Sequence, residues 1–91
     1  MIDGVNIERK NRILIALAAY SYEMLDNPFM SDGDFDALAL SICKEKSTGH
    51  KIMDSFFKKE FCPYTGCWIH KHPELNKIIN LYNRLYGISR A

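Results

Sequence analysis

Apolar residues recur at helical spacing in four segments of this 91-residue chain, and this periodicity limits its fold more than any other feature. The first segment predicts a helix over residues 7–25 with Asn6 as its N-cap. Its apolar stripe consists of Ile13, Leu17, Tyr20 and Met24, widened by Leu14, Ala18 and Leu25. The helix should end at Asp26 and Asn27, because Pro28 disfavours helical backbone at the residue before it.

A second helix should begin at Ser31 and end near residues 44–46. The Ser31 hydroxyl can accept a hydrogen bond from the backbone of Asp34, an arrangement that resembles a capping box with a shortened acid. The apolar side of this helix consists of Phe35, Leu38, Ala39 and Ile42.

Two more helices are expected in the second half of the chain. The third should cover residues 51–61, with Ser47 or Thr48 as its cap. The fourth should carry Pro73 at its first position and stop at Gly87. Their buried sides are predicted to be Ile52, Met53, Phe56, Phe57 and Phe61 in the third helix and Leu75, Ile78, Ile79, Tyr82 and Leu85 in the fourth.

The connection between these two helices contains proline and glycine at residues 62–66, which predicts a turn, and then a short extended stretch at residues 67–69. Because no segment reads convincingly as a strand, the pattern predicts an all-α fold, a compact bundle of three to four short helices. The length predicts a single domain over residues 1–91. Within it, a helical hairpin at residues 7–45 should precede further helices at residues 46–91.

The composition argues against several classes of protein. Lysine and arginine total 12 against 11 aspartate and glutamate, and a net charge of +1 lacks the positive excess that drives nucleic-acid binding. No apolar run approaches the roughly 18–20 residues that cross a bilayer, and the start of the chain does not resemble a signal peptide. The cysteines number three, which favours reduced thiols in a cytoplasm over a disulfide framework.

The most specific pattern in the chain lies between Tyr20 and Leu38. It reads YSYEMLDNPFMSDGDFDAL: an aromatic-rich helix end, an Asp-x-Pro turn, and a second helix start with three aspartates. This block closely resembles the N-terminal Ia domain of NAD⁺-dependent DNA ligases, and the His-Pro-Glu-Leu at residues 72–75 matches a second motif of that family after an insertion. Small stand-alone proteins of this ligase-related type resemble those found in bacteriophage genomes, which would place the chain in a host cytoplasm.

The resemblance implies a ligand site for the nicotinamide mononucleotide (NMN) half of NAD⁺. In the family, two aromatic rings sandwich the nicotinamide and acidic side chains hold its polar groups. Tyr22 falls on the first ring and Phe35 on the second, which is normally tyrosine. Asp32 and Asp36 fall on the two acids, and Glu23 stands where the family has histidine, so that it would tune selectivity.

The chemistry of these residue types agrees with such a ligand. Oxidised nicotinamide is a planar cation, and each aromatic face attracts a cation by about 0.5–2 kcal/mol. Asp32 and Asp36 are four residues apart and therefore share one helix face. Phe35 keeps the stacking face without the hydroxyl, while Glu23 would repel a phosphate. The alternative is structural: the aspartates at 32, 34 and 36 favour a helix N-terminus, and both rings belong to the core.

Two further patterns bear on chemistry. The chain contains no Lys-x-Asp-Gly motif, with which ligases form their lysyl-adenylate, so a non-enzymatic binding protein is expected, with no covalently bound cofactor and with NMN or NAD⁺ as the possible ligand. Cys62, Cys67, His70 and His72 are possible zinc ligands, but their spacing is not that of a usual zinc site. Buried thiols and surface histidines are therefore predicted, with no metal.

Two other roles stay open. The chain could be an interaction or inhibitor module that keeps the Ia shape without a small ligand and acts on a host protein such as the DNA ligase. Trp68, Tyr64 and the last helix would then form the interface, although these two aromatic residues are more typical of core closure. A DNA-binding accessory factor is disfavoured by the charge balance.

Overall fold

Four α-helices and one short 3₁₀ helix account for the fold of the computed structural model, which describes residues 4–86. They are α1 (Gly4–Glu23), α2 (Asp32–Ser41), α3 (Lys51–Lys59), η1 (Cys67–Lys71, the 3₁₀ helix) and α4 (Leu75–Tyr86). The described residues contain no strand, so the predicted all-α class is confirmed. No helix among them is long and apolar enough to cross a membrane.

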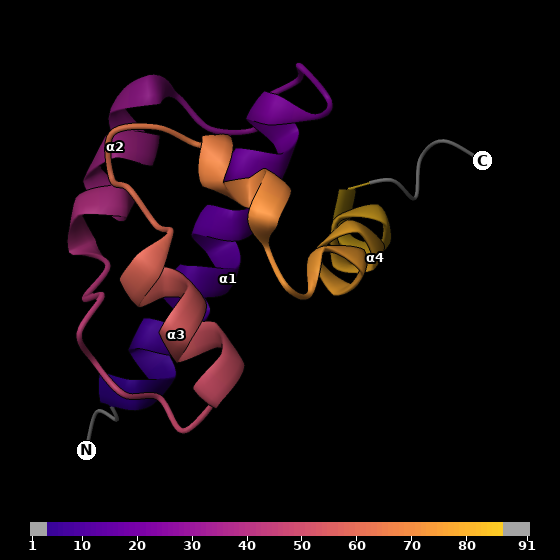
Figure 1. Ribbon diagram of the computed structural model, residues 1–91. Coiled ribbons are helices and arrows are strands. Elements are labelled where there is room, and N and C mark those ends of the chain that lie inside the picture. The colour runs from indigo at the N-terminus through magenta and orange to yellow at the C-terminus, as the bar shows by residue number, and fades with distance from the viewer. Residues whose placement is uncertain (1–3, 87–91) are drawn as a thin grey trace.

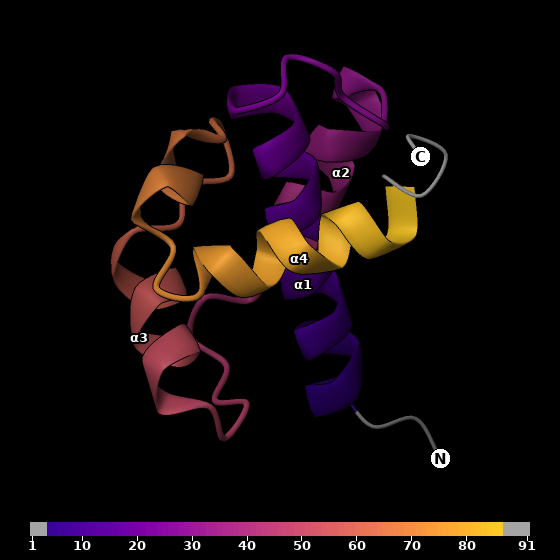
Figure 2. The same cartoon turned by 90° about the vertical axis from the view of Figure 1, so that its right-hand side faces the viewer.

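Helix α1 is the axis on which the other elements pack. It contacts α2, η1 and α4, and α4 also contacts η1. In Figure 1 α2 lies to the left of α1 and α3 lies in front of it, and Figure 2 shows α4 crossing in front of α1. The centre of α1 is accordingly buried throughout, from Ile15 to Ser21.

The ends of α1 differ from those predicted. The helix begins before Asn6, which therefore lies inside it and is not its N-cap. It ends at Glu23 and not at Leu25, because Asp26 adopts a positive φ of 50° and the amide of Asn27 donates to the carbonyl of Ser21 at 2.9 Å. The backbone thus turns before Pro28 is reached.

Helix α2 has the predicted start but an earlier end. The hydroxyl of Ser31 accepts from the amide of Asp34 at 3.1 Å, which confirms the cap. The helix stops at Ser41, well before residues 44–46. Side chains of α1 hold the following backbone instead: Glu8 accepts from the amide of Cys43 at 3.0 Å, and Arg12 donates to the carbonyl of Cys43 at 2.9 Å.

The cap of α3 and the segment before α4 also differ from the prediction. His50, and not Ser47 or Thr48, caps α3 by accepting from the amide of Met53. α3 ends at Lys59 rather than at residue 61. Residues 67–69 lie in η1 and are not extended, since the indole of Trp68 donates to the carbonyl of Thr65 at 2.8 Å and the backbone closes a tight turn.

Helix α4 begins at Leu75, because Pro73 lies in a turn in which the amide of Glu74 donates to Nδ1 of His72 at 3.0 Å. The predicted stop at Gly87 lies outside the described residues.

The core lies where the central part of α1 meets α2, α3, η1 and α4. Its aromatic centre is built from Phe56, Phe57, Phe61 and Trp68, whose rings are 5.1–6.1 Å apart. Several residues predicted to be buried are exposed, namely Ile13, Leu14, Leu25, Ile52 and Leu85. Periodicity identifies the apolar side of a helix. How much of that side a neighbouring element covers depends on tertiary packing.

A buried arginine joins α1 to the chain that packs on it. Arg12 is only 4% exposed and donates to Glu8 and to Asp54, each at 2.8 Å. It also donates to the carbonyls of Cys43 and Lys46 and lies over the ring of Phe57, at 5.0 Å from its centre. These partners come from α1, from α3 and from the segment between α2 and α3, so Arg12 stabilises their arrangement.

Candidate functional site

A cleft of about 270 Å³ lies where the end of α1 meets the start of α2. Its lining residues are Tyr22, Glu23, Asp32, Phe35, Asp36, Tyr64 and Gly66. All of the residues that the sequence singled out as ligand-binding are among them. The other two come from the turn before η1, a segment that the ligase resemblance does not cover.

Local structure explains why these residues meet. Tyr22 and Glu23 occupy the last turn of α1, and the chain then reverses at Asp26. Ser31 caps α2 at once, so that Asp32 lies in the first turn of the next helix. A turn that reverses the chain between two helices brings the end of one beside the start of the other.

The two predicted rings contact each other and do not form a sandwich. The centres of Tyr22 and Phe35 are 5.2 Å apart, and their planes meet at 72°, which is an edge-to-face contact. A flat ligand between parallel rings needs a separation of roughly 7 Å, twice the contact distance of carbon atoms. Phe35 is only 7% exposed and belongs to the core, while Tyr22 is partly buried against that core.

The hydroxyl of Tyr22 donates to the carboxylate of Asp32. This hydrogen bond raises the pKa of Tyr22 to about 12, with smaller contributions from burial and from the charges of Asp32 and Asp36. The phenol therefore stays protonated at neutral pH, and the bond fixes the orientation of the ring at the cleft.

The expectation that Tyr64 closes the core is wrong. Tyr64 is 80% exposed, so it does not close the core beside Trp68. It lines the cleft because the turn at residues 62–66 lies against the end of α1: a Cβ on Gly66 would be 3.5 Å from Cγ of Glu23. No spacing rule in the sequence links Tyr64 to Tyr22, since the contact depends on how the turn packs.

The charged residues that line the cleft are all acidic. Its lining includes the carboxylates of Glu23, Asp32 and Asp36 and no lysine or arginine. The polar neighbours of Glu23 are Nε2 of His70 at 3.8 Å and the thiol of Cys67 at 3.7 Å. Like charges gathered in a concave surface concentrate the opposite charge there, so the cleft attracts cations and repels anions.

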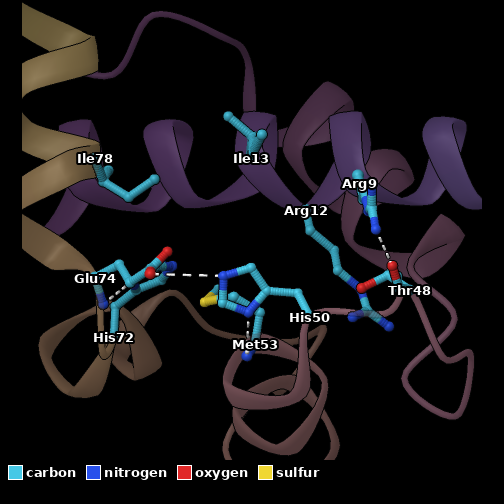
Figure 3. Close-up of a pocket in the computed structure, with 9 residues that line it drawn as sticks. All are labelled: Arg9, Arg12, Ile13, Thr48, His50, Met53, His72, Glu74 and Ile78. Atoms are coloured by element: carbon cyan, nitrogen blue, oxygen red, sulfur yellow. Dashed lines mark hydrogen bonds and ion pairs between the residues drawn. The ribbon is translucent and has the colours of Figure 1, made fainter.

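A second, smaller cavity of about 160 Å³ lies between α1, α3 and the start of α4 (Figure 3). Its polar side chains have partners within the protein: Arg9 donates to the backbone carbonyl of Thr48, and Nε2 of His50 lies 3.6 Å from the carboxylate of Glu74. The remaining walls are largely apolar, with Ile13, Met53 and Ile78 among them. It contains no residue predicted to bind a ligand, and its polar groups already stabilise the fold.

The cysteine and histidine residues do not form a metal centre in the described part of the chain, where no group of three potential ligands gathers. Cys62 is half-buried, and Cys67 and His70 are exposed. His72, in contrast, is buried, so the prediction of a surface histidine is wrong there, as is that of a buried thiol at Cys67. Burial lowers the pKa of His72 to about 4.

Comparison with known proteins assigns no family to this chain. No protein-family model matches the chain, and neither the curated proteins nor the solved structures include one that matches it.

Proposed function

We propose that this protein binds a planar, positively charged aromatic compound of the nicotinamide class, such as NMN, NAD⁺ or a related compound, in the cleft between α1 and α2. The observation that carries the proposal is the gathering of Tyr22, Glu23, Asp32, Phe35 and Asp36 around one cleft. The sequence pattern by itself points to the same five residues.

The chemistry of the cleft suits such a ligand. The ring of Tyr22 offers an aromatic surface held in place by Asp32, and a cation over an aromatic face gains about 0.5–2 kcal/mol. Asp36 and the second oxygen of Asp32 can accept hydrogen bonds from a carboxamide or from ribose hydroxyls. Small-molecule sites typically measure roughly 300–1,000 Å³. The cleft, at about 270 Å³, lies just below this range and therefore suits a ligand portion no larger than one ring and a sugar. The adenosine half of NAD⁺ would lie outside.

We expect binding without a reaction. The chain has no Lys-x-Asp-Gly motif to accept an adenylyl group. The tyrosine at the cleft keeps its proton at neutral pH because its pKa is raised to about 12, which makes it a poor general base.

Calorimetric titration at low salt tests this function. Nicotinamide riboside, NMN and NAD⁺ carry the cationic ring, and ADP-ribose does not. The proposal predicts saturable binding of at least one of the first three compounds and none of ADP-ribose. Absence of heat with all three would contradict it.

A matched pair of variants locates the site. Asp32→Asn with Asp36→Asn should weaken binding at least tenfold, because both carboxylates line the cleft. Asp34→Asn removes an exposed charge from the same turn of α2 without touching the cleft, and its backbone bond to Ser31 remains. Binding by this control should stay within twofold of the unmodified protein.

The interaction-module alternative keeps one of its two predicted aromatic anchors. Trp68 is 4% exposed and packs on Phe57 and Phe61, so it is not available to a partner. Tyr64 is exposed, but it lies at the cleft. We therefore place the ligand-binding function first.

A further inference from the structure

Phe35 cannot serve as the second wall of a ring sandwich in this structure. Its ring meets that of Tyr22 edge to face, and its side chain is buried in the core. A ligand ring that stacks on Tyr22 therefore needs another surface on its far side.

Tyr64 has the properties of that surface. It lines the same cleft from the turn at residues 62–66 and is 80% exposed. Within the described residues its ring contacts no other aromatic ring, whereas Tyr22 and Phe35 contact each other. Because most of its surface is exposed, the ring is accessible to a ligand, and a tyrosine immobilised on binding loses little conformational entropy.

Glu23 is placed where it can repel a negatively charged group of a ligand. It lines the cleft together with Tyr22 and Tyr64. It is held against the turn and η1, with its Cγ 3.5 Å from where a Cβ on Gly66 would be and its carboxylate 3.8 Å from Nε2 of His70. Together with Asp32 and Asp36 it makes an anionic lining without a lysine or arginine. A phosphate group carries up to two negative charges near neutral pH, so this lining opposes it.

We propose that the cleft takes a pyridinium nucleoside in preference to its 5′-phosphate, with Tyr64 as the second stacking wall and Glu23 as the residue that rejects the phosphate. This inference rests on the proposed function and adds its specificity. The nucleoside brings a single positive charge, whereas the phosphate makes the corresponding nucleotide a net anion.

Nicotinamide riboside and NMN differ only by the phosphate and are therefore the probes. Calorimetry at fixed ionic strength should show the riboside binding the unmodified protein at least tenfold more tightly than NMN. Equal or tighter binding of NMN would overturn the inference and leave the proposed function intact. Binding of neither compound, nor of NAD⁺, would overturn the proposed function itself.

Variants then assign the two roles. Glu23→Gln keeps the shape of the side chain and should reduce the preference for the riboside at least threefold, chiefly by improving NMN binding. Glu45→Gln, at an exposed carboxylate outside the cleft, is the control and should leave the preference unchanged. An unchanged preference in Glu23→Gln would show that Glu23 does not reject the phosphate.

Tyr64→Ala should weaken riboside binding at least fivefold, whereas Tyr64→Phe, which keeps the aromatic face, should bind within twofold of the unmodified protein. Because the side chain is exposed, both variants should keep the helical circular dichroism spectrum. Equal affinities of Tyr64→Ala and the unmodified protein would remove Tyr64 from the site.

Discussion

The two ends of α1 handle charge in opposite ways. In its N-terminal half, the buried positive charge of Arg12 is matched by the carboxylates of Glu8 and Asp54 and by two backbone carbonyl oxygens. Near its C-terminal end, Glu23 lines a cleft with Asp32 and Asp36, and no lysine or arginine joins them. The first arrangement connects segments of the fold. The second brings three carboxylates together around a cleft, where Tyr22 donates to Asp32 and the thiol of Cys67 donates to Glu23. Like charges gathered in a cleft support the proposed ligand site.

The pKa values of Asp54 and Tyr22 reflect these two surroundings. Burial alone would raise the pKa of this carboxyl group, but hydrogen bonds from Thr48 and Arg12 outweigh that effect and hold its pKa below the ordinary value of 3.8. The fold therefore stabilises the ionised form of Asp54. In the cleft, the hydrogen bond from Tyr22 to Asp32 raises the pKa of the phenol instead.

The largest expected effect is on stability, at Arg12. Arg12→Met leaves Glu8 and Asp54 without their buried partner and should lower the free energy of unfolding by about 3–5 kcal/mol. Chemical denaturation measures this change. Lys58→Met, which breaks an exposed pair with Glu45, is the control and should cost less than about 1 kcal/mol. Similar losses in both variants would contradict the distinction between the two kinds of charge.

The next effect is a pH dependence at His72. The pKa of this side chain is about 4 in the folded protein, and 6.5 is its ordinary value. Between these values the unfolded chain binds more protons than the folded one, so stability should fall as the pH is lowered from 6.5 to 4. The loss should approach roughly 2 kcal/mol, allowing for the partial solvent contact of the ring.

His72→Asn checks the origin of that loss. An asparagine oxygen can still accept from the amide of Glu74, but it does not titrate. The slope of stability against pH between 6.5 and 4 should therefore be reduced in this variant. A slope equal to that of the unmodified protein would assign the dependence to other groups.

The smallest expected effect is on binding, at Tyr22. Tyr22→Ala should weaken affinity for the nicotinamide ring by at least about 1 kcal/mol, because one aromatic face is lost. Tyr22→Phe keeps that face and loses only the bond to Asp32, so its loss should be smaller. Titration calorimetry on both variants gives the comparison, and an unchanged affinity in Tyr22→Ala would exclude stacking on this ring.

Much of the fold follows from local rules that the sequence displays. Apolar periodicity predicts the four helices, and Ser31 predicts the start of α2, because a cap depends on residues three positions apart. The early end of α2 could not be predicted in this way. It depends on bonds from Glu8 and Arg12, more than thirty residues earlier in the chain.

The residues of the cleft likewise fall into a group that local structure brings together and one residue that it does not. Tyr22, Glu23, Asp32, Phe35 and Asp36 lie on two helices joined by a short turn, so their proximity follows from local structure. Tyr64 comes from a distant turn, and nothing in its neighbouring residues indicates where that turn packs. The angle between the rings of Tyr22 and Phe35 likewise depends on core packing and not on sequence spacing.

The comparison between the two ends of α1 is tested most directly by mapping nicotinamide riboside onto the protein with backbone amide NMR spectra. Saturable shifts are expected at Tyr22, Asp32, Asp36 and Tyr64, while the amides around Arg12 stay unmoved. Shifts centred on the cavity between α1, α3 and α4, or no shifts at millimolar ligand, would contradict this expectation.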